Sequence, residues 1–207
     1  MSERTAVVLA GGRSTRFGDG DKAVADLAGT PMIRRVVDRI TPVVDAVVVN
    51  CRAAQRSTIG DALNGAGVPV TFAEDDYPDE GPMAGMATGL RAVDGEHAFV
   101  VACDMPFVDA AFVDYLFERA AEHDAAVPRP DQWFETTHAV YRAAAMADAC
   151  EAALEAGEDR IVAPLFELDF VVVDGEEVRT HGHPRTFENC NTPEDFEDAA
   201  RRLNDGS

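Results

Sequence analysis

The chain contains little positive charge. Lysine and arginine together number 18 among 207 residues, against 38 aspartates and glutamates, so the formal net charge is −20. Nucleic acids and anionic membranes would repel such a surface, and we exclude both as expected partners. No apolar run is longer than about six residues, whereas a membrane-spanning helix needs about 20. The N-terminal apolar stretch is polar again by Arg13, too early for a secretion signal, so we expect a cytoplasmic protein.

Closely spaced metal ligands are also absent. The four cysteines lie 40 or more residues apart, which excludes a paired zinc motif or a redox CxxC motif. His181 and His183 are separated by one residue, but no third ligand lies near them in the sequence. We therefore interpret the cysteines as inert thiols and the two histidines as part of a polar loop.

Segments typical of strands alternate with segments typical of helices. Strands are predicted at 5–10, 45–50, 68–73, 97–103, 134–142 and 169–174, and helices at 31–40, 53–63, 83–93, 109–123, 143–157 and 191–203. This order predicts a three-layer α/β/α protein with a mostly parallel, Rossmann-like sheet. The chain has no linker or internal repeat, so we predict one domain over residues 1–207.

Polar residues follow the carboxyl ends of the first four predicted strands. They comprise the stretch 11–22, Asn50, the stretch 74–82 and Asp104. Ligands of parallel α/β sheets bind at this edge, where the loops leave the strands. The four clusters therefore predict one shared site.

The first cluster lies in LAGGRSTRFGDGDKA, residues 9–23, which matches neither a Walker loop nor a dinucleotide fingerprint. It nevertheless contains the components of a phosphate site, because Gly11 and Gly12 allow backbone N–H groups to approach an anion. Lys22 is the one lysine in a chain with 17 arginines. Its compact ammonium fits between phosphate oxygens. We predict that this loop holds a nucleoside triphosphate, with Lys22 and Arg16 offsetting the charge of the reacting phosphates.

Asp104 ends a hydrophobic strand in the sequence CDMP, where a carboxylate suits a magnesium ion that also binds nucleotide phosphates. The alternative is that Asp104 caps the helix predicted from residue 109, although Pro106 and Asp109 offer that helix its own start. We predict the metal role. Acidic residues near Asp75 could accept hydrogen bonds from a ribose or a base, the alternative being a solvated acidic loop.

Five segments resemble, in order and spacing, the molybdenum cofactor guanylyltransferases: LAGGRSTRFGDGDKA, VVVN, GPMAG, CDMP and FENCNTPEDF. The resemblance covers about residues 5–200 and implies the sugar-nucleotidyltransferase-like fold. It implies transfer of GMP from GTP to the terminal phosphate of molybdopterin, with magnesium as cofactor and pyrophosphate as leaving group. A protein that inserts molybdenum, or one that accepts the cofactor, would then be a partner.

The resemblance and the loop chemistry together assign roles to residues. Nucleotide binding is expected at Leu9, Ala10, Gly11, Gly12, Lys22, Asn50, Asp75 and Asp104; catalysis at Lys22, Arg16 and Asp104; and acceptor binding at Gly81, Gly85, Asn189 and Asn191. The metal ligand is Asp104. The nucleotide would thus occupy the part before about residue 108, and the acceptor the part from about 109.

Two departures from the family pattern lie on the acceptor side. Thr-Thr-His at 136–138 replaces a Pro-Leu or Pro-Thr step, and Asp159 and Arg160 stand where relatives often have two arginines. A molybdopterin cytidylyltransferase, a guanylyltransferase for cobinamide phosphate or phospholactate, and a non-catalytic nucleotide-binding or docking domain remain alternatives. By resemblance alone LAGG favours guanine, because cytidylyl relatives tend to have LAAG. We interpret Trp133 as packing in the core or a loop in preference to stacking on a pterin.

Overall fold

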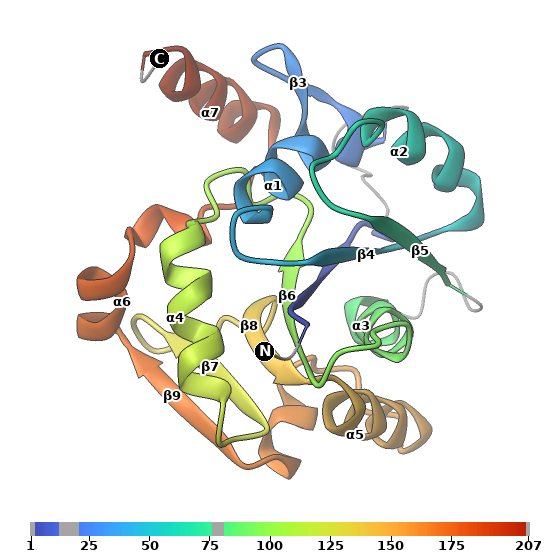
Figure 1. Ribbon diagram of the computed structural model, residues 1–207, viewed down its shortest axis with the longest axis vertical. Helices are drawn as coiled ribbons and strands as arrows, with labels where there is room; N and C mark the ends of the chain where they lie inside the picture. Colours follow the sequence, from blue (N-terminus) through green and yellow to red (C-terminus); the bar gives the residue numbers. More distant parts are fainter. Residues whose placement is uncertain (1–2, 13–20, 76–80, 206–207) are drawn as a thin grey trace.

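The computed structural model describes residues 3–12, 21–75 and 81–205, and its centre is a seven-stranded sheet (Figure 1). The strands, in spatial order, are β5 (Val70–Glu74), β4 (Ala46–Cys51), β1 (Thr5–Leu9), β6 (His97–Ala102), β8 (His138–Arg142), β7 (Ala125–Arg129) and β9 (Phe170–Asp174). β8 is antiparallel to both of its neighbours, and the other pairs are parallel. The predicted mostly parallel sheet is confirmed.

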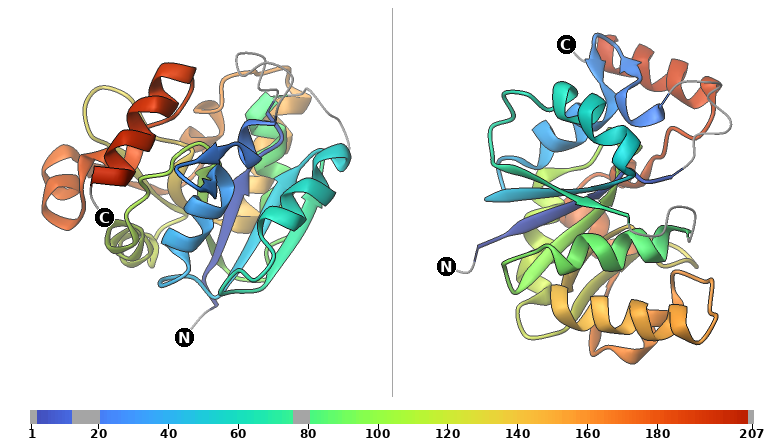
Figure 2. Two further views of the ribbon diagram at one scale, coloured as in Figure 1. Left: turned by 90° about the horizontal axis from the view of Figure 1, so that it is seen from above. Right: turned by 90° about the vertical axis from the view of Figure 1, so that its right-hand side faces the viewer.

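Helices cover both faces of the sheet, as two further views show (Figure 2). One face carries α1 (Met32–Ile40), α2 (Arg56–Ala62), α4 (Ala110–Ala120) and α6 (Gly175–His181), and the other carries α3 (Gly81–Arg91) and α5 (Ala143–Glu155). The last helix, α7 (Pro193–Asp205), packs beside a hairpin of β2 (Asp26–Leu27) and β3 (Thr30–Pro31). No helix among the described residues is long and apolar enough to cross a membrane.

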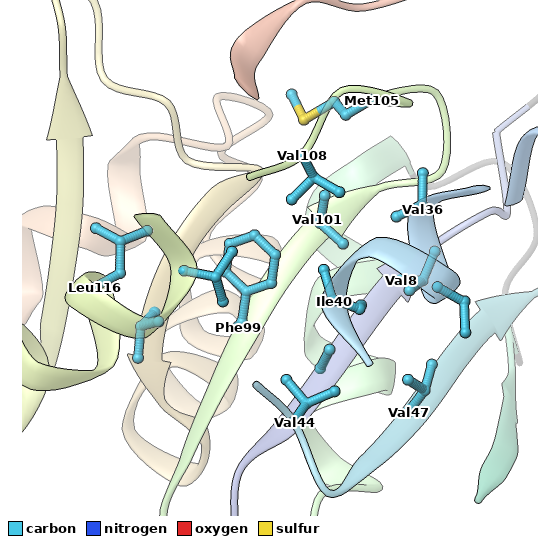
Figure 3. Packing of buried hydrophobic residues seen from close by; sticks show 14 of the residues in the cluster. Val8, Val36, Ile40, Val44, Val47, Phe99, Val101, Met105, Val108 and Leu116 are labelled. Atoms are coloured by element: carbon cyan, nitrogen blue, oxygen red, sulfur yellow. The ribbon is translucent and has the colours of Figure 1, made fainter. Parts of the chain in front are cut away.

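The larger core lies between the sheet and the layer of α1 and α4 (Figure 3). Val36 and Ile40 of α1 are four residues apart, so they point from one side of the helix onto the sheet. They meet Val8 and Val47 from neighbouring parallel strands, and all four side chains are completely buried. Strands buried on both faces explain why β1 and β4 read as continuous apolar runs in the sequence.

The second half of the chain differs from the sequence prediction in three places. The predicted strand 134–142 is shorter, because His138 N donates to Glu135 O in a turn and β8 begins only at His138. β7 was not predicted; it is only five residues long and contains Pro128, a residue that argues against a strand. α6 was not predicted either, although Asp174 and Glu177 form a capping box at its start.

α3 packs very closely on β1 at Gly89. A Cβ added there would lie under 3.0 Å from Val7 Cγ1, and that methyl group belongs to a fully buried valine. The glycine therefore sets how closely this helix approaches the sheet.

We predict that Gly89→Ala destabilises the protein by about 1–3 kcal/mol, the usual cost of overpacking a core. Gly60→Ala is the matched control, because a Cβ in α2 would meet only Phe72 Cζ, at 3.8 Å. It should be neutral or stabilising by about 0.5–1 kcal/mol, since alanine has the higher helix propensity. Denaturant unfolding of both variants measures the difference; equal stabilities would contradict the packing argument.

Candidate active site

Backbone hydrogen bonds hold the carboxyl ends of three neighbouring strands together. Cys103 N donates to Leu9 O at 3.0 Å, and Ala10 N donates to Asn50 O at 2.8 Å. The segments that leave β4, β1 and β6 therefore begin side by side at one edge of the sheet. The polar residues predicted to share a site follow these strand ends.

Lys22 and Asp104 form an ion pair at this edge. Lys22 Nζ lies 2.6 Å from Asp104 Oδ2, and the two side chains are only 11% and 17% exposed. Asn191 Oδ1 accepts a second hydrogen bond from Lys22 Nζ at 3.0 Å. Three segments that are far apart in the sequence thus meet around one ammonium group.

The segment before α7 holds this pair from the side of the C-terminus. Cys190 N donates to Asp104 O at 2.9 Å. Asp195 Oδ2 accepts from the N–H groups of Asn191 and Thr192, while Thr192 Oγ1 accepts from Asp195 N. Thr192 and Asp195 therefore cap the start of the helix predicted over 191–203, and this cap also fixes the backbone that carries Asn191.

A second group of predicted residues surrounds the Asn50 side chain, which is 1% exposed. Asn50 Nδ2 donates to Asp75 Oδ1 at 2.5 Å and to Ala73 O at 3.3 Å. A Cβ at Gly85 would lie 2.5 Å from Asn50 Oδ1, and one at Gly11 would collide with Asp75 Oδ2. Both glycines are therefore required for the close approach of α3 and the first loop to this pair.

Gly85, which we expected on the acceptor side, lies with residues expected to bind the nucleotide. Gly81, at the start of α3, has a φ of +84°, a conformation that favours glycine. Asn189 lines a hollow of about 470 Å³ beneath α7, together with Phe107 and Arg202. Gly12 is exposed, and Arg16 lies outside the described residues.

Asp104 does not cap α4, contrary to the alternative interpretation. Asp109 occupies the cap position, and its Oδ1 accepts from Ala111 N at 3.0 Å. Asp104 Oδ1 is buried and has no hydrogen-bond partner among the residues that the structure describes. A buried carboxylate oxygen without a partner is costly unless something else satisfies it, and a cation would do so. The described residues contain no cluster of three or more His, Cys, Asp or Glu side chains that could hold a metal.

The cysteines next to this aspartate lack the character of nucleophiles. Burial, with the Asp104 charge nearby, raises the pKa of the Cys103 thiol well above its usual range and that of Cys190 to about 12. Both thiols therefore remain protonated near neutral pH, and a protonated thiol is a poor nucleophile and metal ligand.

The sequence analysis also interpreted two histidines and a tryptophan, and the structure shows where each of them lies. His181 stacks on Tyr115 at 3.7 Å between ring centroids, and His183 Nδ1 accepts from Arg185 N. His181 is the last residue of α6, so the interpretation as a polar loop is wrong for it, whereas His183 lies in the polar segment just after that helix. Trp133 lies in a loop and is 69% exposed, so of the two expected environments, core or loop, the structure excludes the core.

The comparisons with known proteins agree with this geometry. Residues 6–169 match the model of the MobA-like NTP transferase domain. The chain belongs to the MobA-like NTP transferase family. A probable molybdenum cofactor guanylyltransferase of Natronomonas pharaonis is 53% identical over 98% of this chain and 100% of its own length. Another from Haloferax mediterranei is 40% identical over 93% of this chain and 91% of its own.

Two solved structures share the fold. Molybdopterin-guanine dinucleotide biosynthesis protein A from Archaeoglobus fulgidus superposes with a TM-score of 0.80 at 29% identity, covering 97% of this chain and 99% of its own. A nucleotidyl transferase from Methanothermobacter thermautotrophicus superposes with a TM-score of 0.74 at 20% identity, covering 99% of both chains, and so supports the fold alone. This MobA-like protein is therefore a nucleotidyltransferase of the predicted fold.

We predict that Gly85→Ala weakens binding of the nucleoside triphosphate by about tenfold or more. The added methyl group would displace the Asn50 amide and leave Asp75 without that partner. Isothermal titration with GTP measures the effect, and Gly60→Ala is the control for exchanging a helical glycine. Unchanged affinity in Gly85→Ala would mean that the Asn50 group takes no part in nucleotide binding.

Proposed function

We propose that this chain transfers GMP from GTP to the terminal phosphate of molybdopterin and releases pyrophosphate. The observation that carries the proposal is the pairing of Lys22 with Asp104 at the carboxyl edge of the sheet, where Asp104 Oδ1 accepts no hydrogen bond from the described part of the chain. The family membership and the two archaeal relatives named as molybdenum cofactor guanylyltransferases support the same reaction.

Lys22 would neutralise negative charge on the reacting phosphates. Its ammonium is held by Asp104 and Asn191, so its position is already determined before a nucleotide enters. A preorganised cation stabilises charge that develops in the transition state without further reorganisation. Gly11 and Gly12, at the start of the same loop, would let backbone N–H groups approach the nucleotide.

Asp104 would hold the divalent cation. Nucleotidyltransferases of this family generally use one, and magnesium is our specific proposal. Oδ1 is the oxygen that fits, because it is buried and no described residue bonds to it, while Oδ2 accepts from Lys22. When bound, Mg²⁺ would supply Lewis-acid stabilisation of the charge on the phosphates.

The acceptor needs no strong general base from the protein. A phosphate monoester is already anionic near pH 7, so it can attack the α-phosphorus once it is positioned in line. The residues of this chain then contribute by orienting the two substrates and by neutralising charge. Asn50 and Asp75 would contact the nucleoside, and the part of the chain after about residue 108 would bind the acceptor.

Asn189 and Asn191 are the residues after about position 108 to which we assign binding of the acceptor. Asn189 lines the hollow under α7, and Asn191 bonds to Lys22. A protein partner that inserts molybdenum or receives the product, and a cytoplasmic location, stay predictions. Supplying each of the four NTPs with Mg²⁺ and molybdopterin, and identifying the dinucleotide formed, tests the whole proposal; formation of the cytosine form would overturn it.

We predict that Lys22→Ala lowers turnover by roughly 10²-fold or more, the usual effect of removing a preorganised charge from a transition state. Arg91→Ala removes a cation on α3 whose ion pairs with Asp148 and Glu151 are exposed, and it should leave turnover close to that of the wild type. Pyrophosphate release measures both. A Lys22→Ala variant as active as the control would remove this lysine from the mechanism.

We predict that Asp104→Asn lowers transfer by orders of magnitude but weakens GTP binding less, since the loop residues that hold the nucleotide are unchanged. The substitution keeps the size of the side chain and removes the charge that would hold Mg²⁺. Asp109→Asn is the matched control, because that aspartate caps α4.

Calorimetry with and without Mg²⁺, beside pyrophosphate release, separates binding from turnover in these two aspartate variants. Circular dichroism reports whether each variant is folded. If Asp104→Asn transfers at the wild-type rate, the metal assignment is wrong. If it is unfolded while Asp109→Asn is folded, Asp104 has a structural role.

A further inference from the structure

Gln55 lies beneath the start of the glycine-rich loop, although it belongs to a different part of the chain. It ends a short 3₁₀ turn, Ala53–Gln55, that follows β4, and it is only 4% exposed. Its Nε2 donates to Ala10 O at 2.9 Å and to Asp21 Oδ2 at 2.7 Å. One buried amide group therefore joins the residue before Gly11 to the residue before Lys22.

The orientation of this amide is determined by its four partners. Oε1 accepts from Arg52 N at 3.0 Å and from Arg52 Nε at 2.9 Å. Two donors face the oxygen, and two acceptors face the nitrogen, so every hydrogen-bonding position of the side chain is used. A flipped amide would face like groups on both sides and is excluded.

Asp21 links Gln55 to the turn that contains Lys22. Its Oδ2 accepts from Gln55, and its Oδ1 accepts from Ala23 N at 3.1 Å, which caps the 3₁₀ turn Lys22–Val24. On the other side, Ala10 also donates through its N–H to Asn50 O. Gln55 thus bonds directly to Asp21, which caps the turn that carries Lys22, and directly to Ala10, the residue before Gly11.

We propose that Gln55 is a positioning residue for nucleotide binding, which sets the location of Gly11 relative to Lys22 without itself touching the substrate. The inference rests on the proposed function, because it assumes that these two residues bind the same nucleotide. Two groups that must hold successive parts of one ligand lose affinity when either one moves by about an ångström. A side chain that joins both backbone segments prevents that movement.

The test is binding of GTP to full-length Gln55→Glu and Gln55→Met by isothermal titration. Glutamate places a carboxylate against a carbonyl oxygen and a second carboxylate, whereas methionine removes both donors without adding charge. We expect GTP affinity to fall about tenfold or more in both variants. In transfer assays KM for GTP should rise, while KM for the acceptor stays unchanged.

A paired exchange distinguishes positioning from a general structural role. In the double variant Asp21→Asn with Gln55→Glu, the new asparagine can donate to the new carboxylate, so the link between the two segments is restored except at Ala10 O. We expect this variant to recover part of the GTP affinity lost in Gln55→Glu.

Tyr141→Phe is the control for losing a buried hydrogen bond, since Tyr141 Oη donates to Thr136 O in another part of the sheet. It should bind GTP as the wild type does. Wild-type affinity in both single variants, or a loss that matches a reduced folded fraction without recovery in the double variant, would overturn the inference. A wild type that binds no GTP would instead overturn the proposed function, and this inference with it.

Discussion

The ion pair between Lys22 and Asp104 is the contact on which the arrangement of the site depends. It joins the end of the glycine-rich loop to the end of β6, 82 residues further along the chain. Asn191 adds a third segment through its hydrogen bond to Lys22, and Cys190 binds the backbone of Asp104. Because the pair is largely buried, its electrostatic attraction is stronger than that of a surface pair, and moving either partner would leave the other charge poorly solvated.

The sheet order explains why this contact can form at all. β1 lies between β4 and β6 and is parallel to both, so the segments that follow these three strands leave the sheet at the same edge. The reversal at β8 does not disturb this edge, because β8 pairs with β6 on the side away from β1. α7 packs against the hairpin that follows the first loop, and this contact brings Asn191 over the same edge. Active-site residues from both ends of the chain thus depend on packing rather than on proximity in sequence.

Much of the fold could be predicted because periodicity and strand composition are local properties. β1, β4 and β6 are short β-branched runs followed by polar residues, and the structure has them at the predicted places. β7 could not be predicted, since its stability comes from two neighbours and its Pro128 argues against a strand. The exposure of Trp133 was also missed, because a tryptophan in a loop carries no local signal of whether other chain segments will cover it.

The sequence by itself assigned Lys22, Asn50, Asp75 and Asp104 to one edge, because each lies at or beyond the end of an apolar strand and Lys22 is the one lysine of the chain. Only the tertiary structure decided their partners. Asn50 meets Asp75 because two neighbouring parallel strands end together, and Lys22 meets Asp104 because β6, which precedes Asp104, lies beside β1, which precedes the glycine-rich loop. No sequence pattern pointed to Gln55, since a glutamine after a strand looks the same in sequence whether it faces water or forms four hydrogen bonds inside the protein. Hydrogen bonds between distant segments depend on the completed fold, and residue type alone does not specify them.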